Sequence, residues 1–365
     1  MGLKCGIVGL PNVGKSTLFN CLSNAKAQAA NFPFCTIEPN IGITNVPDER
    51  LDVLAKLANP QKVVPATVEI VDIAGLVKGA SKGEGLGNLF LSHIRETDAI
   101  IHVLRCFDNE NIIHVEGSIN PVRDKEIIDI ELQIKDLESV DKKIQRISKM
   151  AKVGDKDARK GLGNLAIYKQ HLEAGKSARS IVLPEEDKKI VDDIHLITAK
   201  PILYLCNVDE KSVSNGNKYV DMVRENVKNE KAEVLVVAAA IEAEIAELEN
   251  YEDRKVFLEE LGLKEAGVNK LIKAAYRLLN LSTYFTVGEK EVRAWTIVKG
   301  MSAPQAASVI HTDFEKGFIK AEVMKYNDFI FYKSEFACKE VGKLSIEGKE
   351  YIVSDGDIMH FRFNV

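Results

Sequence analysis

The sequence predicts an α/β fold in which a parallel sheet alternates with helices, a helical insertion interrupts it and a small α+β domain follows. Three observations predict this. Short apolar runs recur between helix-like segments, a central stretch has the apolar spacing of long helices, and period-two alternation begins after about Leu281. With 365 residues, the chain is long enough for two or three domains.

The apolar runs have four to six residues each, which is typical of buried parallel strands rather than of helices. The expected strands are Cys5–Val8, Thr67–Val71, Ala99–Leu104, Ile202–Cys206 and Val234–Val237.

The composition is that of a globular protein, with 45% hydrophobic and 28% charged residues. A net charge of −5 excludes a protein that coats nucleic acid over its whole surface, and we expect no sequence-specific DNA binding. The six cysteines are scattered, which favours buried free thiols in a reducing compartment over a zinc site. There is no cleavable signal pattern and no run of about 20 apolar residues. We therefore expect a cytoplasmic protein without a membrane partner.

Two helices are expected within residues 117–200. Apolar residues recur every three or four positions from Ile127 to Ala151, and a second such pattern runs from Ala158 to Leu172. Gly154 between them allows the chain to reverse. The pattern predicts an antiparallel coiled-coil arm.

Charge is concentrated in this arm. Residues 142–180 contain eleven Lys/Arg, opposed by Asp155, Asp157 and Glu173, so the segment carries +8 while the rest carries −13. A solvated helical face is the simpler interpretation. The segregation favours a footprint for a phosphate backbone, and ribosomal RNA is the expected partner.

The segment Gly9–Ser16 matches the pattern GxxxxGK[ST] between an expected strand and an expected helix, Thr17–Asn24. In this context the glycines let backbone N–H groups turn toward phosphates, at a helix N-terminus that favours anions. The lysine would reach the β- and γ-phosphates and serve catalysis. The expected phosphate-binding residues are Asn12, Val13, Gly14, Lys15, Ser16 and Thr17.

A Mg²⁺ site is expected beside this loop. The Ser16 hydroxyl would ligate the ion, and Asp72, which begins a DxxG motif at a strand end, would hold it through water. Thr36 would complete the shell when a triphosphate is bound. The glycine-rich run after Asp72 would form the second switch.

Together these segments resemble the YchF subfamily of Obg-related P-loop proteins, also called Obg-like ATPases, over essentially the whole chain. The segments that carry the resemblance are residues 9–17 and 31–40, the glycine-rich run after Asp72, residues 207–210 and the segment from Leu281. The resemblance implies a Ras-like nucleotide domain (1–116 and 201–280), a coiled-coil insertion (117–200) and a C-terminal β-grasp, TGS-like domain (281–365). It also implies ATP hydrolysis and association with ribosomes.

The residues expected to contact the base depart from the Asn-Lys-x-Asp pattern of GTPases. Val208 stands in place of the lysine and Glu210 in place of the aspartate, and a mismatched buried hydrogen-bond set disfavours guanine. ATP is therefore expected over GTP, with Asn207 or a backbone carbonyl accepting from the adenine amine. Ala239 sits where the family's last base-contacting loop lies. Asp209 could still serve guanine through a shift of one residue.

The water-positioning group is left open. Leu76 occupies the position of the Ras-like catalytic glutamine and cannot orient water, so hydrolysis should be slow without a partner. Asn12 matches the asparagine that coordinates K⁺ in cation-activated relatives, which makes K⁺ a candidate second ion. His114 is the first candidate for positioning water and His93 the second, although a lone histidine is more often structural.

The main interpretation is a slow, partner-stimulated ATPase, and three alternatives are considered. One is a GTPase of the same architecture, and another is a nucleotide-gated ribosome-binding adaptor with incidental hydrolysis. The third, an accessory of tRNA charging, lacks any synthetase signature in the sequence.

Overall fold

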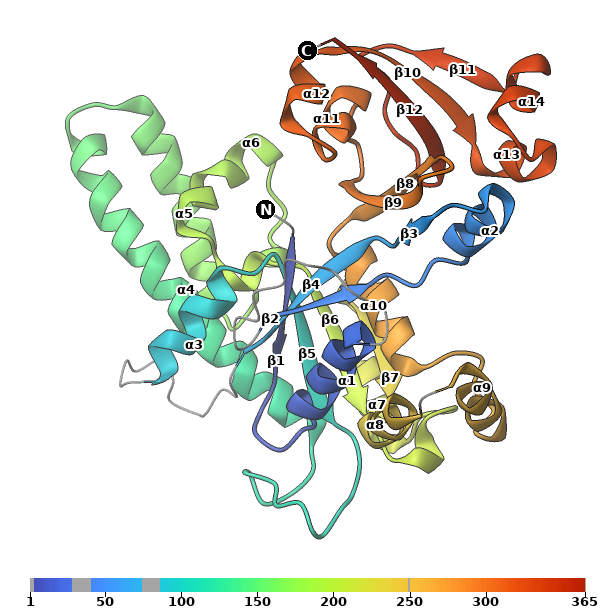
Figure 1. The fold of residues 1–365 in the computed structure, drawn as a ribbon. Coiled ribbons are helices and arrows are strands. Elements are labelled where there is room, and N and C mark those ends of the chain that lie inside the picture. The colour runs from blue at the N-terminus through green and yellow to red at the C-terminus, as the bar shows by residue number, and fades with distance from the viewer. Residues whose placement is uncertain (1–2, 28–40, 74–85, 249, 365) are drawn as a thin grey trace. The chain divides into compact units, whose positions relative to one another are not determined.

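The computed structural model describes residues 3–27, 41–73, 86–248 and 250–364 (Figure 1). The chain divides into two compact units. Unit 1 comprises Met1–Gly42 and Glu69–Leu271, and unit 2 comprises Ile43–Val68 and Ile272–Val365.

The sheet of unit 1 has the strand order β2-β4-β1-β5-β6-β7. Strand β1 pairs in parallel with β4 and β5, β5 with β6, and β6 with β7. The strands are β1 (Lys4–Val8), β2 (Ile41–Asn45), β4 (Thr67–Asp72), β5 (Ala99–Arg105), β6 (Ile202–Asn207) and β7 (Glu233–Val237). All five strands predicted from apolar runs are confirmed. The prediction missed β2, whose alternating burial gives it no continuous apolar run.

Helices alternate with these strands, as a parallel sheet requires. They are α1 (Lys15–Ala27), α3 (Leu86–Arg95), α7 (Lys218–Val227), α8 (Ala239–Glu247), α9 (Tyr251–Glu260) and α10 (Gly267–Leu278). Helix α1 packs against α8, so the loops that precede these two helices lie at the same edge of the sheet.

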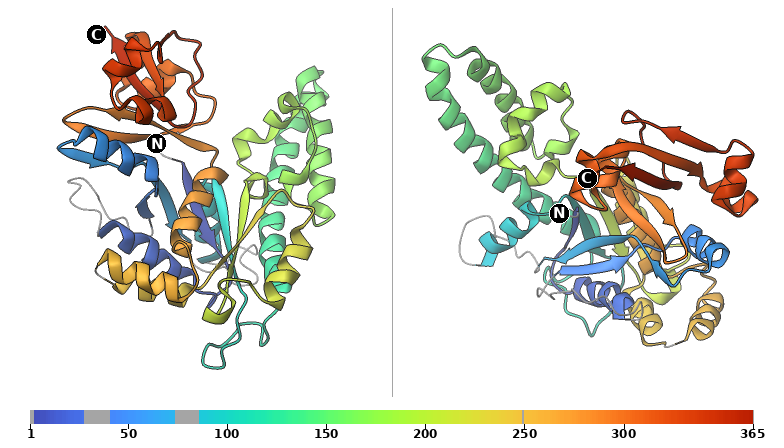
Figure 2. Two further views of the ribbon diagram at one scale, coloured as in Figure 1. Left: turned by 90° about the vertical axis from the view of Figure 1, so that its right-hand side faces the viewer. Right: turned by 45° about the horizontal axis from the view of Figure 1, so that its top comes forward.

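The predicted two-helix arm is confirmed: α4 (Pro121–Lys152) and α5 (Lys156–Glu173) pack along each other as a hairpin (Figures 1 and 2). Asn120 caps α4 and Asp155 caps α5, each by accepting a backbone N–H. Val140, Leu165 and other apolar residues of the stripe form the arm's own core. The short helices α6 (Glu185–Lys188), η2 (Ala178–Ser180), η3 (Lys189–Ile194) and η4 (Ile197–Ala199) follow.

Unit 2 is built on a second sheet, with the order β11-β10-β12-β8-β9-β3. Its strands are β3 (Lys62–Val64), β8 (Leu281–Val287), β9 (Glu291–Val298), β10 (Phe318–Lys325), β11 (Leu344–Glu347) and β12 (Asp357–Phe363). Its helices are α2 (Glu49–Ala58), α11 (Ala303–Ser308), α12 (Thr312–Lys316), α13 (Tyr326–Tyr332) and α14 (Glu335–Glu340). Helix α11 is one of four short helices that follow Leu281.

The two compact units differ in two details from the domains expected from the sequence. Residues 43–68 were expected in the nucleotide domain, but they group with the C-terminal residues because β3 pairs in parallel with β9. Unit 2 also begins at Ile272, within α10, rather than at residue 281. Strand β12 pairs antiparallel with β10 and in parallel with β8.

The described cysteines, Cys5, Cys21, Cys106, Cys206 and Cys338, are buried free thiols, as expected. Burial raises the pKa of Cys5 to about 12, so this thiol is protonated and unreactive at neutral pH. Within the described ranges, no helix has both the length and the apolar character needed to cross a membrane.

Candidate nucleotide-binding site

The loop between β1 and α1 has the conformation that a phosphate-binding loop requires. Gly14 has a φ of +97°, and Asn12, at φ +61°, occupies the left-handed region that asparagine tolerates. Gly9 lies so close to β5 that a Cβ there would stand 2.6 Å from the Val103 carbonyl oxygen. The loop therefore lies close to the sheet, with a glycine where a side chain would collide and an asparagine where the backbone is left-handed.

Asn207, at the end of β6, ties this loop to the next one. Its Nδ2 donates to the Val13 carbonyl over 2.9 Å, and its Oδ1 accepts from the Ala239 N–H over 2.9 Å. The side chain is buried, and a Cβ on Gly14 would approach its Nδ2 to 2.3 Å. Asn207 thus fixes the phosphate loop against the start of α8. It was predicted to accept from the adenine amine, but its Oδ1 already accepts from Ala239, and the amide hydrogen that remains can only donate.

The charges of Lys15 and Asp72 act on each other inside the site. Lys15 is buried at the first position of α1, and its pKa is lowered by burial, an effect that the charge of Asp72 opposes. The pKa of Asp72 is raised, mainly by burial and against the charge of Lys15. One carboxylate oxygen of Asp72, Oδ1, is buried without a hydrogen-bond partner. A buried acceptor of this kind is costly unless a ligand or ion satisfies it.

The first turn of α1 leaves its polar groups accessible. Ser16 and Thr17 are exposed, and the turn contains no acidic residue. A helix N-terminus of this kind carries partial positive charge and unsatisfied N–H groups, which favour an anion. Thr36, the other expected Mg²⁺ ligand, lies outside the described residues.

The residues expected to select the base follow β6. Val208 is buried and its N–H donates to the Val237 carbonyl, so its backbone extends the sheet. Asp209 caps the 3-10 turn η5 (Glu210–Ser212) by accepting from the Ser212 N–H over 2.9 Å. This bond holds Asp209 in a cap and opposes the shift that would bring it to guanine. Glu210 is exposed at the start of that turn.

His114 is held by its neighbours in this structure. Its Nε2 lies 2.8 Å from Asp124 Oδ2, and its Nδ1 accepts from the Glu116 N–H over 3.1 Å. An accepting Nδ1 places the proton on Nε2, so both nitrogens are engaged. In this arrangement His114 cannot orient a water, contrary to the role expected of it. Asp124, whose part in holding the ring the sequence did not suggest, is buried on the first turn of α4.

The loop that carries His114 nevertheless lies beside the phosphate loop. Asn12 Nδ2 donates to the Ile113 carbonyl over 3.1 Å. His93, the second candidate, is exposed on α3. Leu76 and residues 74–85 of the glycine-rich run lie outside the described residues.

The charge of the arm is less segregated than the sequence suggests. Lys143 and Arg146 both pair with Asp193, Lys160 pairs with Asp187, and Lys169 pairs with Asp141. Within the described chain, no ion pair engages a group of exposed cations around the turn of the arm. This group, the arm-tip cations, consists of Lys149, Lys152, Lys156 and Arg159.

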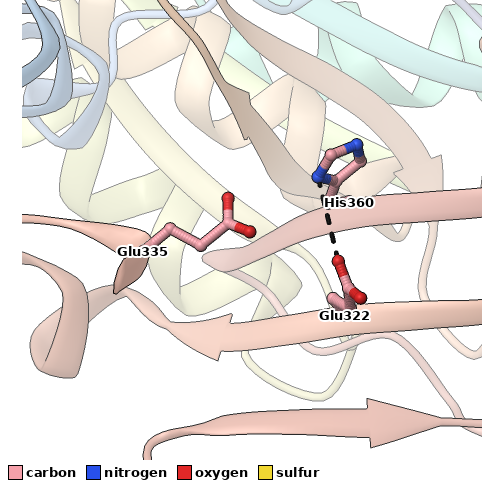
Figure 3. A group of neighbouring side chains, drawn as sticks. All are labelled: Glu322, Glu335 and His360. Carbon is pink, nitrogen blue, oxygen red and sulfur yellow. Dashed lines mark ion pairs between the residues drawn. The ribbon is translucent and has the colours of Figure 1, made fainter. Parts of the chain in front are cut away.

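One group of potential metal ligands occurs in unit 2 within the described residues: Glu322, Glu335 and His360 (Figure 3). His360 on β12 lies 3.9 Å from Glu322 on β10, and Arg362 Nη2 lies 2.9 Å from the same carboxylate. Burial alone would raise the pKa of Glu322, but the Arg362 hydrogen bond and the charges of Arg362 and its neighbours lower it overall. The carboxylate already has cationic partners, so we assign no metal there.

Comparisons with known proteins agree with this geometry. A family described as 50S ribosome-binding GTPase matches residues 4–150, and a YchF-GTPase C-terminal family, described as a protein of unknown function, matches residues 281–364. The ribosome-binding ATPase YchF of Haemophilus ducreyi is 58% identical over 365 residues, and that of Bacillus subtilis is 56% identical over 367, each covering 100% of both chains. The solved YchF GTPase of Schizosaccharomyces pombe is 41% identical with a TM-score of 0.90, covering 99% of this chain and 98% of that one. This chain belongs to the YchF subfamily of Obg-related P-loop proteins.

Proposed function

We propose that the protein binds and slowly hydrolyses ATP and that it associates with the ribosome in the cytoplasm. The observation that carries the nucleotide part is the β1–α1 loop, with Gly14 at positive φ, Lys15 buried behind it and an unpartnered Asp72 oxygen nearby. The relatives named above as ribosome-binding ATPases support the partner and the reaction.

The site fits Mg²⁺ as its ion. The buried, unpartnered Oδ1 of Asp72 and the exposed hydroxyl of Ser16 are the hard oxygen donors that Mg²⁺ prefers. Thr36 is the third proposed ligand. When bound, the ion supplies neutralisation of the phosphate charge. Lys15 would hold the β- and γ-phosphates, and the backbone of residues 12–17 would orient them.

The choice of base is proposed from the loop after β6. Glu210 replaces the aspartate that GTPases use, and Asp209 is engaged as a helix cap. The relatives' names differ on this point, since the bacterial proteins are called ATPases and the fission-yeast protein a GTPase.

Calorimetric titration of the protein with Mg·ATP and Mg·GTP tests the base. We expect ATP to bind more tightly by about tenfold or more, because a guanine amide without its carboxylate acceptor loses charge-assisted hydrogen bonds. The non-hydrolysable analogues of both nucleotides serve as controls for turnover during the titration. Tighter binding of GTP would replace the ATPase proposal with the GTPase.

His114 remains the proposed water-positioning group, on the condition that its loop rearranges. To face a phosphate, the ring must leave Asp124 and the Glu116 amide, and the Ile113 carbonyl must release Asn12. Asn12 is also the residue proposed to hold K⁺. This requirement fits slow hydrolysis without a partner. Unchanged turnover in His114→Ala would exclude the role.

The arm-tip cations are proposed to contact the phosphate backbone of ribosomal RNA. We expect the combined reversals Lys149→Glu, Lys152→Glu and Lys156→Glu to weaken co-sedimentation with ribosomes and to flatten its dependence on salt. Each lost phosphate contact should reduce the salt slope by about one.

Lys143 is unsuitable for this experiment because it is buried against Asp193, and a glutamate there would destabilise the arm. Reversal of Lys255 on α9, an exposed cation outside the arm, is the control. Ribosome binding by the triple variant that equals the control's would remove the arm tip from the interface.

A further inference from the structure

Two adjoining cavities form a groove between α3 and α4, of about 690 and 370 Å³. Arg95, Lys135 and His195 line both, and we name this feature the α3–α4 groove. Together the two cavities are lined by six Lys/Arg and four Asp/Glu side chains. The groove lies wholly within unit 1 and is separate from the nucleotide site described above.

Arg95, at the end of α3, is the least satisfied cation of this groove. Its Nη2 donates to Ser139 Oγ over 3.1 Å, but its Nε is buried without a hydrogen-bond partner. Arg95 makes no ion pair with any carboxylate of the described chain. The charge of Asp136 acts on it, yet both oxygens of that carboxylate already accept hydrogen bonds from Ile197 and Thr198.

The other cations of the groove divide into paired and unpaired groups. Lys143 and Arg146 share Asp193, and Lys135 lies 3.0 Å from Glu138. Lys142 and His195 are exposed, and the structure gives their side chains no such partner. The groove therefore presents a guanidinium without an ion pair from α3, an ammonium without one from α4, and the imidazole of His195, which follows η3.

The buried Nε leaves the charge of Arg95 incompletely hydrogen-bonded, and an anion in the groove that Arg95 lines would offset this charge by accepting from its Nη groups. A phosphate oxygen suits it best, since the planar fork of arginine matches phosphate geometry. The exposed Lys142 adds charge for a neighbouring phosphate. A free phosphate would contact only Arg95, whereas consecutive phosphates of a nucleic-acid backbone would contact both Arg95 and Lys142.

We propose that the α3–α4 groove binds the phosphate backbone of RNA, with Arg95 as the donor to one phosphate and Lys142 as the donor to the next. The proposal rests on the ribosome association proposed above and adds a site for it away from the arm tip. It involves neither the base nor hydrolysis.

The test is fluorescence anisotropy of a fluorescein-labelled hairpin RNA titrated with the full chain at several salt concentrations. We expect Arg95→Gln to weaken binding by about tenfold and to reduce the salt slope by about one. Arg224→Gln is the matched control, because Arg224 is an exposed cation on α7 that does not line the groove. Thermal unfolding of both variants shows whether either substitution has disturbed the fold.

A folded Arg95→Gln variant that binds the hairpin as the control does would overturn the proposal. Lys142→Gln gives a second reading, since it removes an exposed side chain with no partner to leave unsatisfied, and its failure to weaken binding would count equally against the proposal. Inorganic phosphate distinguishes the source of the anion. If phosphate binds in an Arg95-dependent manner while RNA does not, the site is one for a free anion and the RNA proposal is wrong. If the arm-tip variant loses ribosome binding while Arg95→Gln and Lys142→Gln keep it, the proposed ribosome association stands and the groove proposal is wrong.

Discussion

Lys15→Ala is expected to lower kcat/KM for ATP hydrolysis by about 10³-fold, which is the scale seen when a positioned donor to developing charge is lost. Lys15 is buried beside Asp72, so its ammonium is the cation that the site holds ready for phosphate charge. Removing it leaves the Asp72 carboxylate without its opposing charge, next to the place where an anion must bind. The loss of the ammonium and the unopposed carboxylate both disfavour binding of the phosphate charge, so both lower kcat/KM.

Phosphate release at saturating Mg·ATP, together with its dependence on ATP concentration, measures this loss. Lys255→Ala, which truncates an exposed lysine on α9, controls for removal of a positive charge. If Lys15→Ala hydrolyses ATP as fast as the Lys255 variant, the β1–α1 loop is not the catalytic phosphate site.

Gly14→Ala is expected to weaken ATP binding by about 100-fold, the sum of two effects. The residue has a φ of +97°, where an L side chain costs about 1–2 kcal/mol. The added Cβ would also stand 2.3 Å from Asn207 Nδ2, so the bond from Asn207 to the Val13 carbonyl must break or the loop must shift. Loss of a buried hydrogen bond of this kind costs about 1–3 kcal/mol.

Titration with Mg·ATP measures the effect of Gly14→Ala, and Gly163→Ala is its matched control. Gly163 lies within α5, where an added Cβ meets nothing within 4 Å. There we expect unchanged ATP affinity and a gain in stability of about 0.5–1 kcal/mol, because alanine favours the helix. An unchanged ATP affinity in Gly14→Ala would contradict the loop geometry described here.

The parts predicted best from the sequence are those in which a local pattern determines the structure. The five strands are short, mostly apolar runs, and the arm helices carry a stripe of period three to four. The phosphate loop is specified by its own glycines and lysine. In each case the residues that cause the structure are neighbours in the chain.

The parts that could not be predicted depend on residues distant in sequence. Nothing near Asn207 indicates that its amide bonds Val13, which precedes it by 194 residues. Likewise, His114 was expected to face water, and nothing in the sequence marks Asp124, a residue of a helix's first turn, as the partner of its ring. The charge count covered only residues 142–180, so it did not include Asp187 and Asp193, with which lysines of the arm pair.

The excursion of residues 43–68 into unit 2 has a consequence for how the protein can be divided. The chain leaves unit 1 along β2 and contributes the helix α2 and the strand β3 to unit 2. It then returns along β4, which ends at Asp72. A fragment beginning at Leu281 would thus lack β3 and leave the edge of β9 open to pairing with other molecules. No single cleavage of the polypeptide yields both units intact, because each unit is built from two separate stretches of the chain.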